Sequence, residues 1–212
     1  MRGRQAGEGM ISPGEFIPYA ETTGVIMQID EWVIRHACQQ IRKWKLQGLP
    51  VPKVSINISA KMMSNPRLTD IFRKAVSEYK VDFRDIGVEV TETAIINDMD
   101  SAILTLVQLR QLGVMISLDD FGTGYSSLTY LERLPIDIMK IDRQFVKNIQ
   151  KKDEESFILK TSIEMAHALR LRVIAEGVET EEQLNVLQRY QCDSVQGFYF
   201  HQPKPAEDIG VL

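Results

Sequence analysis

The stretch that decides the fold reads Val54-Ser55-Ile56-Asn57-Ile58-Ser59, a short run in which apolar and polar residues alternate. Such alternation is typical of a β-strand that packs one face on helices and carries polar groups on the other. The run over 114–119 repeats the pattern, because Ile116 and Leu118 alternate with Ser117 and Asp119. Both runs therefore predict strands that deliver polar side chains to one side of a sheet.

Strand-like and helix-like stretches alternate along the rest of the chain. The expected strands are short, rich in β-branched residues, and cover 54–59, 86–91, 114–119, 136–141, 173–176 and 195–200. The expected helices are amphipathic and cover 30–47, 66–79, 99–112, 126–133, 154–169 and 181–189. Alternation across six strands predicts an α/β fold, with a parallel sheet and right-handed crossovers.

Polar groups at the strand ends favour a barrel over an open doubly wound sheet. Each expected strand has one at or near its end, namely Asn57, Glu89, Asp119 with Asp120, Lys140, Glu176 and Gln196. An open sheet gathers ligand groups mainly where the strand order reverses, whereas a (β/α) TIM-like barrel uses the ends of all its strands. Closure usually takes about eight strands. We therefore expect a barrel that is incomplete at its N-terminus, with about six parallel strands present.

Composition excludes several classes of protein. The 212 residues carry 25 basic and 29 acidic side chains, a net charge of −4, which argues against a basic surface that coats DNA. No apolar run approaches the ~20 residues that cross a bilayer, and the first nine residues lack the features of a secretory signal. Two distant cysteines and three scattered histidines form no disulfide framework or zinc motif. We expect one cytoplasmic domain.

Acidic side chains are expected to crowd the mouth of this barrel. The residues concerned are Glu89, Asp119, Asp120, Glu176 and Glu179, and Lys140 supplies a single counter-charge. A lone acidic residue at a strand end more often caps a helix and faces water, but six strands with the same feature weaken that explanation. Oxygen ligands, with the amide of Asn57 among them, suit Mg²⁺ or Mn²⁺ rather than zinc.

Taken together, the motifs resemble those of the EAL domains, which bind or hydrolyse the bacterial second messenger cyclic di-GMP. The resemblance runs over about 9–205. It is carried by Phe16-Ile17-Pro18-Tyr19-Ala20-Glu21, Asn57 with Ser59, Glu89-Val90-Thr91-Glu92, Asp119-Asp120-Phe121-Gly122-Thr123-Gly124-Tyr125-Ser126-Ser127, Lys140-Ile141-Asp142, Ala175-Glu176-Gly177-Val178-Glu179 and Gln196-Gly197-Phe198. It implies a single EAL-like domain over 1–212, with a poorly matched segment over 1–15 and the barrel over 16–205.

The resemblance also implies a role for each matching residue. Asn57, Glu89 and Asp119 correspond to ligands of one metal ion, and Asp119 and Asp120 to ligands of a second. Lys140 and Glu176 correspond to the groups that orient the attacking water, with Glu176 as proton acceptor. The remaining matches are Glu92, which anchors the loop over 121–127, and three substrate-binding residues, Arg2, Glu179 and Gln196. The implied reaction opens cyclic di-GMP to the linear dinucleotide pGpG by two-metal hydrolysis.

The Glu-Ala-Leu motif that names the family does not occur in the sequence. Counting back from Gly9 places it immediately before Met1. Without its glutamate, a metal ligand in the family, we expect weakened metal binding and slight or no turnover. Three hypotheses follow: a cyclic di-GMP phosphodiesterase, a degenerate cyclic di-GMP receptor or protein-interaction module, and an unrelated acidic-mouthed barrel hydrolase acting on another phosphoester.

Unpaired strands at the opening of the barrel also predict association. An exposed apolar edge invites pairing with another chain, and symmetric dimers are the common result. We therefore expect a homodimer that covers the edges of the 54–59 and 195–200 strands. The resemblance further allows for a sensory or cyclase domain upstream.

Overall fold

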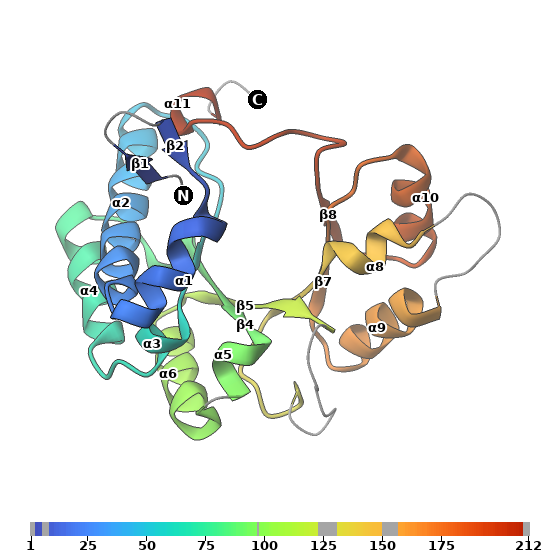
Figure 1. The fold of residues 1–212 in the computed structure, drawn as a ribbon, viewed down its shortest axis with the longest axis horizontal. Helices are drawn as coiled ribbons and strands as arrows, with labels where there is room; N and C mark the ends of the chain where they lie inside the picture. Colours follow the sequence, from blue (N-terminus) through green and yellow to red (C-terminus); the bar gives the residue numbers. More distant parts are fainter. Residues whose placement is uncertain (1–2, 6–8, 97, 123–130, 150–156, 210–212) are drawn as a thin grey trace.

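Six parallel strands form one curled sheet, the incomplete (β/α) barrel that the strand-end polar groups predict (Figure 1). The computed structural model describes residues 3–5, 9–96, 98–122, 131–149 and 157–209. The strands, in spatial order, are β3 (Val54–Asn57), β4 (Ile86–Thr91), β5 (Met115–Phe121), β6 (Ile138–Ile141), β7 (Arg172–Glu176) and β8 (Ser194–Gln196). Because this order never reverses, the sheet has no switch point, which excludes the open doubly wound alternative.

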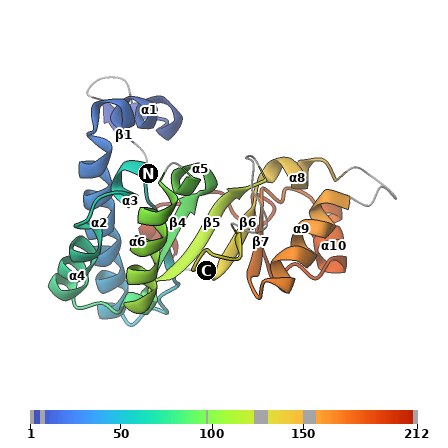
Figure 2. The same cartoon turned by 90° about the horizontal axis from the view of Figure 1, so that it is seen from below.

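Helices flank the sheet on its outer side and cap one end of it. They are α1 (Pro13–Thr23), α2 (Ile26–Leu46), α3 (Ala60–Met63), α4 (Leu68–Tyr79), the 3-10 helix η1 (Phe83–Asp85), α5 (Glu92–Ile96), α6 (Met99–Gln111), α8 (Arg143–Lys147), α9 (Phe157–Ala168), α10 (Glu181–Arg189) and α11 (Ala206–Ile209). Figure 2 shows α5 and α8 at the end where their strands finish. A hairpin of β1 (Gly3–Gln5) and β2 (Gly9–Ile11) precedes α1. Within the described ranges, no helix is long and apolar enough to cross a membrane.

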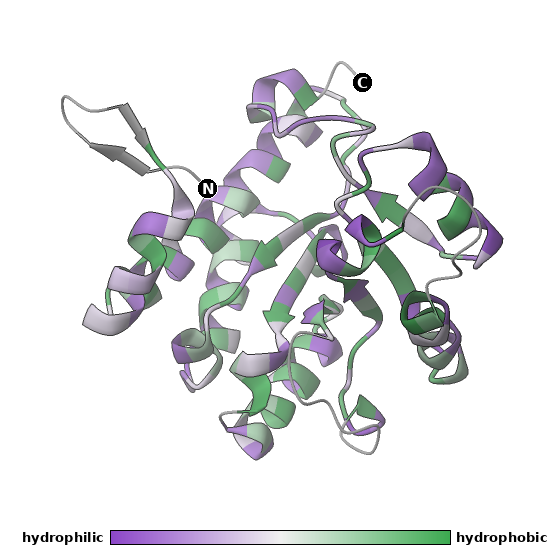
Figure 3. Cartoon of the chain, turned by 45° about the vertical axis from the view of Figure 1, so that its right-hand side comes forward, coloured by the Kyte–Doolittle hydropathy of each residue, from purple (hydrophilic) through white to green (hydrophobic). Residues whose placement is uncertain are grey.

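The hydrophobic core lies between the sheet and its outer helices. Ile34, Cys38 and Ile41 recur at helical spacing along α2 and are fully buried. They belong to one cluster with Phe72 of α4 and the strand residues, of which Ile116 is fully buried. Figure 3 shows the same division, with hydrophobic residues on the strands and hydrophilic residues on the outward parts of the helices. This packing holds the strands in register and so fixes where their carboxyl ends lie.

Several boundaries differ from those predicted by the sequence. The strand expected over 195–200 ends at Gln196, because the chain turns at Gly197, whose carbonyl oxygen accepts from the backbone N–H of Phe200 at 3.1 Å. Helix α2 begins at Ile26, four residues before the expected start. The expected helix over 126–133 lies mostly outside the described residues. The short helices α3, α5 and α8 were not predicted.

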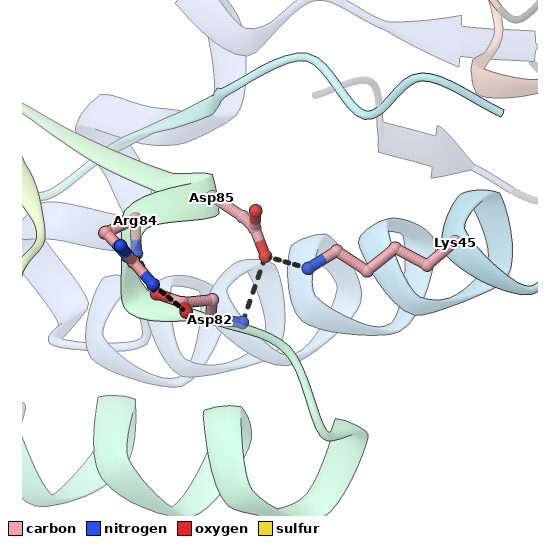
Figure 4. A network of polar contacts seen from close by, with 4 residues as sticks. All are labelled: Lys45, Asp82, Arg84 and Asp85. Atoms are coloured by element: carbon pink, nitrogen blue, oxygen red, sulfur yellow. Dashed lines mark hydrogen bonds and ion pairs between the residues drawn. The ribbon is translucent and has the colours of Figure 1, made fainter. Parts of the chain in front are cut away.

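Charged residues tie α2 to the amino end of the sheet (Figure 4). Lys45 of α2 forms an ion pair with Asp85, whose carboxylate also accepts from the backbone N–H of Asp82 at 3.0 Å. Arg84 donates twice to the Asp82 carboxylate, at 3.2 and 3.0 Å, and these hydrogen bonds lower the pKa of Asp82 to about 2. The network fixes η1, the turn that leads directly into β4.

After β8, the chain returns to the opposite flank of the sheet. Figure 1 shows this segment running from β8 to α11, beside α2. The indole Nε1 of Trp44 in α2 donates to the backbone oxygen of Ala206 at 3.3 Å. The C-terminal segment, residues 197–209, thus joins the two sides of the curled sheet across its opening.

Candidate active site

Four neighbouring strands bring charged side chains together around Lys140. Its Nζ lies 2.7 Å from an oxygen of Glu89, 3.1 Å from Asp119 and 2.7 Å from Glu176. These residues come from β6, β4, β5 and β7 in that order. Lys140 is 4% exposed, so its ammonium group is surrounded by protein. We call these four residues the lysine cluster; they are the convergence of strand-end groups that the sequence predicts.

Burial and charge act in opposite directions on the groups of this cluster. Burial by itself lowers the pKa of Lys140, but hydrogen bonds with Glu176 and Glu89 outweigh it and leave that pKa raised. Burial raises the pKa of Glu176 above its ordinary range, although hydrogen bonding to Lys140 opposes the shift. Lys140 therefore remains charged at neutral pH, while Glu176 gains affinity for a proton.

Asp120 reaches the same region through an irregularity in β5. The pairing of β5 with β6 shifts between Leu118 and Phe121, and Asp120 between them adopts a positive φ of 56°. Bulges of this kind re-aim a side chain and are common beside active sites. Burial raises the pKa of Asp120, and the charges of Asp119 and Asp142 raise it further. Asp119 and Asp120 are thus consecutive acids held close to one another.

Asn57 ends β3, in register with Glu89 of β4. Just beyond it, the buried carboxylate of Asp30 accepts from the backbone N–H of Ser59 at 3.2 Å and from its hydroxyl at 2.5 Å. Burial raises the pKa of Asp30. Because β3 is an edge strand, this anchor from α2 fixes its carboxyl end. The sequence analysis did not identify Asp30, although a carboxylate four residues before Ile34, on the apolar face of a helix, was a usable signal.

A pocket of about 500 Å³ opens beside Glu176 at the ends of β7 and β8. Glu179 and Gln196, two of the expected substrate-binding residues, line it together with Phe198. Its outer wall comes from residues 201–204 of the C-terminal segment, which the sequence analysis did not identify. The structure thus places a carboxylate of raised pKa at one side of a cavity of ligand size.

Helix α8 lies between Gly122, which directly follows β5, and Gly177, which directly follows β7. A Cβ atom at Gly177 would stand 2.4 Å from Cβ of Arg143, and one at Gly122 would stand 2.6 Å from the ring of Phe145. Both glycines have positive φ, of 72° and 93° respectively. At each of these two positions the chain can approach α8 closely only because the residue is a glycine.

Two further residues expected at the site are Glu92 and Arg2. Glu92 begins α5 and is 1% exposed, and neither of its carboxylate oxygens has a hydrogen-bond partner in the described part of the chain. The loop that it is expected to anchor, 121–127, lies largely outside the described residues. Arg2 also lies outside them.

A metal ion would meet mainly oxygen ligands at this mouth. Among the residues that the structure describes, no three acidic, histidine or cysteine side chains form a ready metal-binding group. The ammonium of Lys140 lies instead among Glu89, Asp119 and Glu176. One ammonium does not balance these three carboxylates and Asp120, so the donor set suits a hard divalent cation in chemistry and charge.

The comparisons with known proteins agree with this geometry. The family described as EAL domain matches residues 1–203. The chain is 42% identical over 201 residues to the bifunctional diguanylate cyclase/cyclic di-GMP phosphodiesterase MucR of Pseudomonas aeruginosa, covering 95% of this chain and 29% of that protein. It is 42% identical over 205 residues to the cyclic di-GMP phosphodiesterase NbdA of the same organism, covering 97% and 26%. The chain thus spans less than a third of each relative.

Solved structures of related proteins have a similar fold. A PaMucR phosphodiesterase in complex with c-di-GMP has a TM-score of 0.91 and 41% identity, covering 98% of this chain and 84% of that one. The EAL domain of Mycobacterium smegmatis DcpA has a TM-score of 0.79 and 32% identity, covering 85% of this chain and 81% of that one. Both similarities extend over most of the curled sheet and its helices.

Proposed function

Because the chain belongs to the EAL domain family, we propose that it hydrolyses cyclic di-GMP to linear pGpG as a metal-dependent phosphodiesterase domain. The observation that carries the proposal is the lysine cluster, which adjoins a pocket of about 500 Å³ at Glu176. Relatives named as cyclic di-GMP phosphodiesterases and a related c-di-GMP complex support this choice of substrate. In this proposal one EAL domain over 1–212 carries the activity, with its barrel over 16–205.

The lysine cluster would activate and orient a water molecule. Glu176 accepts the proton of that water, a role for which its raised pKa is suited. Lys140 holds Glu176 in place through a hydrogen bond of 2.7 Å and remains charged beside the developing negative charge. Glu179, Gln196 and Arg2 bind the nucleotide, and Glu92 anchors the loop over 121–127.

Divalent cations, Mg²⁺ or Mn²⁺, complete the proposed site. Asn57, Glu89, Asp119 and Asp120 would hold them. Bound there, they would polarise the phosphodiester and lower the pKa of water.

Binding without turnover is the second candidate function. Apart from Glu176, the described lining of the pocket does not belong to the lysine cluster and includes Glu179, Gln196 and Phe198. It could therefore retain a dinucleotide even where the metal site is impaired. Cyclic di-GMP that binds to the purified chain and stays intact with Mn²⁺ would establish a receptor in place of an enzyme.

We expect Mn²⁺ or Mg²⁺ to stabilise the folded chain. Repulsion among Glu89, Asp119 and Asp120 is relieved when a cation binds, and a cation at ~100 times its Kd adds about 2.7 kcal/mol. For a chain of this size, that corresponds to a rise in melting temperature of roughly 5–10 °C. Thermal melts with and without millimolar cation measure the rise, and an assay for pGpG measures turnover.

Asp119→Asn should abolish most of this rise and any hydrolysis of cyclic di-GMP. Asp100→Asn is the matched control, because the Asp100 side chain is 92% exposed on α6. A melting temperature that does not respond to cation in the unmodified chain would show that these carboxylates form no working metal site.

The proposal also includes a further domain that precedes this one in the whole protein. The relatives are much longer than this chain, and the name of MucR joins the phosphodiesterase to a cyclase. A sensory or cyclase domain in the whole protein is therefore part of the proposal.

We expect the chain to form a homodimer through the sheet edges at β3 and β8, where strand pairing ends. Light scattering coupled to size exclusion should give the mass of two chains. Ser194→Lys places a charge on the exposed edge of β8 and should shift the equilibrium toward monomer, whereas Ser64→Lys, after α3, should not. A stable monomer at high concentration would contradict this expectation.

A further inference from the structure

The side-chain amide of Gln183 forms hydrogen bonds in two directions. Its Oε1 accepts from the backbone N–H of Glu179 at 2.7 Å and from that of Thr180 at 3.1 Å. Its Nε2 donates to the backbone oxygen of Val146 in α8, at 3.3 Å. Gln183 belongs to α10, so one side chain joins three segments: the loop after β7, helix α8 and helix α10. It is 8% exposed, which makes its amide a buried polar group with its partners satisfied.

These bonds go beyond an ordinary helix cap. Thr180 and Gln183 form a capping box, in which the Gln183 backbone N–H donates to the Thr180 hydroxyl and the Gln183 side chain accepts from the Thr180 backbone. A capping box requires only those two bonds. The bonds to Glu179 and Val146 are additional, and the bond to Glu179 is the shortest of the set. Capping α10 therefore does not explain the whole arrangement.

The bond to Glu179 acts on the wall of the pocket. Glu179 lines that pocket, and its neighbour Val178 is fixed to β8 by a bond from its backbone N–H to the oxygen of Gln196, at 3.0 Å. The backbone of Tyr199 donates to Val178 at 2.9 Å from the other side. Val178 is thus held by β8 and its continuation, whereas the backbone N–H of Glu179 is held by Gln183.

We propose that Gln183 is a positioning residue, which fixes Glu179 in the pocket wall and thereby sets the affinity for the nucleotide ligand. This rests on the proposed function, in which the pocket takes cyclic di-GMP. Without the Gln183 amide, the Glu179 segment is free to leave its position, and the ligand must restore the order when it binds. The apparent affinity then equals the intrinsic affinity multiplied by the fraction of chains whose pocket wall is in the binding-competent position.

Gln183→Met tests the proposal, because methionine fills a similar volume and makes neither set of hydrogen bonds. Depriving the backbone groups of Glu179, Thr180 and Val146 of their Gln183 partner should weaken cyclic di-GMP binding about ten-fold, measured by titration in EDTA so that no hydrolysis competes. KM in Mn²⁺ should rise by a similar factor while kcat changes less than about two-fold, because Glu179 lies in the binding wall and outside the lysine cluster. Gln188→Met, at an exposed position of the same helix, is the matched control and should leave both values unchanged.

Gln183→Glu separates the two sides of the amide. Its carboxylate can still accept from Glu179 and Thr180 but cannot donate to Val146, so it should retain most of the affinity that Gln183→Met loses. Amide hydrogen exchange in the ligand-free chain should show faster exchange at Glu179 in Gln183→Met than in the unmodified protein. Equal affinity in the methionine variant, or a loss confined to kcat, would overturn the proposal.

The exchange measurement keeps the proposal separate from the proposed function. If the unmodified chain does not bind cyclic di-GMP, the proposed function fails. In that case faster exchange at Glu179 in Gln183→Met still supports the positioning role, and unchanged exchange still refutes it.

Discussion

Lys140→Met is expected to destabilise the fold by roughly 3–5 kcal/mol and to lower any phosphodiesterase activity by at least about a hundredfold. Lys140 is 4% exposed and its Nζ contacts carboxylates of Glu89, Asp119 and Glu176 within 3.1 Å. Removing the ammonium leaves these partly buried carboxylates without the counter-charge that Lys140 supplies. The loss of activity follows because Glu176 also loses the hydrogen bond that holds it.

The destabilisation should depend on pH in a defined direction. Burial raises the pKa of Glu176 above its unfolded value, and without Lys140 the hydrogen bond and charge that oppose this rise are lost. Groups of this kind stabilise the fold below the unfolded pKa and lose that effect as the pH rises through the folded pKa. The deficit of Lys140→Met should therefore be smaller at pH 5 than at pH 8.

Urea unfolding at pH 5 and at pH 8 measures how far the free energy of unfolding falls in Lys140→Met. Lys147→Met, an exposed lysine on α8, is the matched control and should change stability little. The double variant with Glu176→Gln removes one of the unpaired charges, so it should recover part of the stability and none of the activity. A Lys140→Met chain as stable as the unmodified one at pH 8 would show that the cluster is not held together by this ammonium.

Gly197→Ala is expected to cost about 3 kcal/mol, the upper part of the range for overpacking, and to abolish most nucleotide binding. A Cβ atom at this position would stand 2.1 Å from the carbonyl oxygen of Val178 and 2.3 Å from its nitrogen. Both are backbone atoms, so no side chain can rotate away. The loop after β7 must then separate from β8, which breaks the bond between Val178 and Gln196 and opens the pocket wall.

Gly14→Ala provides the control for this substitution. Gly14 lies in α1, where the nearest atom to an added Cβ is 3.8 Å away, and alanine there should be neutral or slightly stabilising. Melting temperature and cyclic di-GMP affinity are measured for both variants. If Gly197→Ala has the same affinity and stability as the unmodified chain, then Gly197 and Val178 are not packed as described.

The general fold could be predicted from the sequence because strand periodicity and strand-end polarity are local patterns. The lysine cluster is an example: Glu89, Asp119, Lys140 and Glu176 each lie at or near the end of a recognisable strand, and parallel strands end on the same side. The end of β8 was predicted wrongly, because Phe198 and its neighbours have high strand propensity. The contact of Gly197 with Val178, which ends the strand, is a tertiary feature that propensity does not reveal.

Gln183 and Asp30 show a second limit of sequence reasoning. Both are polar side chains on amphipathic helices, where a solvated position is the ordinary expectation, yet they are 8% and 5% exposed. Their partners, at Val146 and Ser59, lie 37 and 29 residues away in the sequence. No local pattern encodes such pairs. The roles proposed for Arg2 and Glu92 stay predictions, because Arg2 and most of the loop expected to meet Glu92 lie outside the described residues.

Helix α8 has a consequence for communication within the site. Phe145 lies close to Gly122 and Arg143 lies close to Gly177, so the five residues of α8 act as a spacer between the end of β5 and the end of β7. A displacement of the chain at either glycine must therefore be absorbed by α8 or passed on to the other glycine.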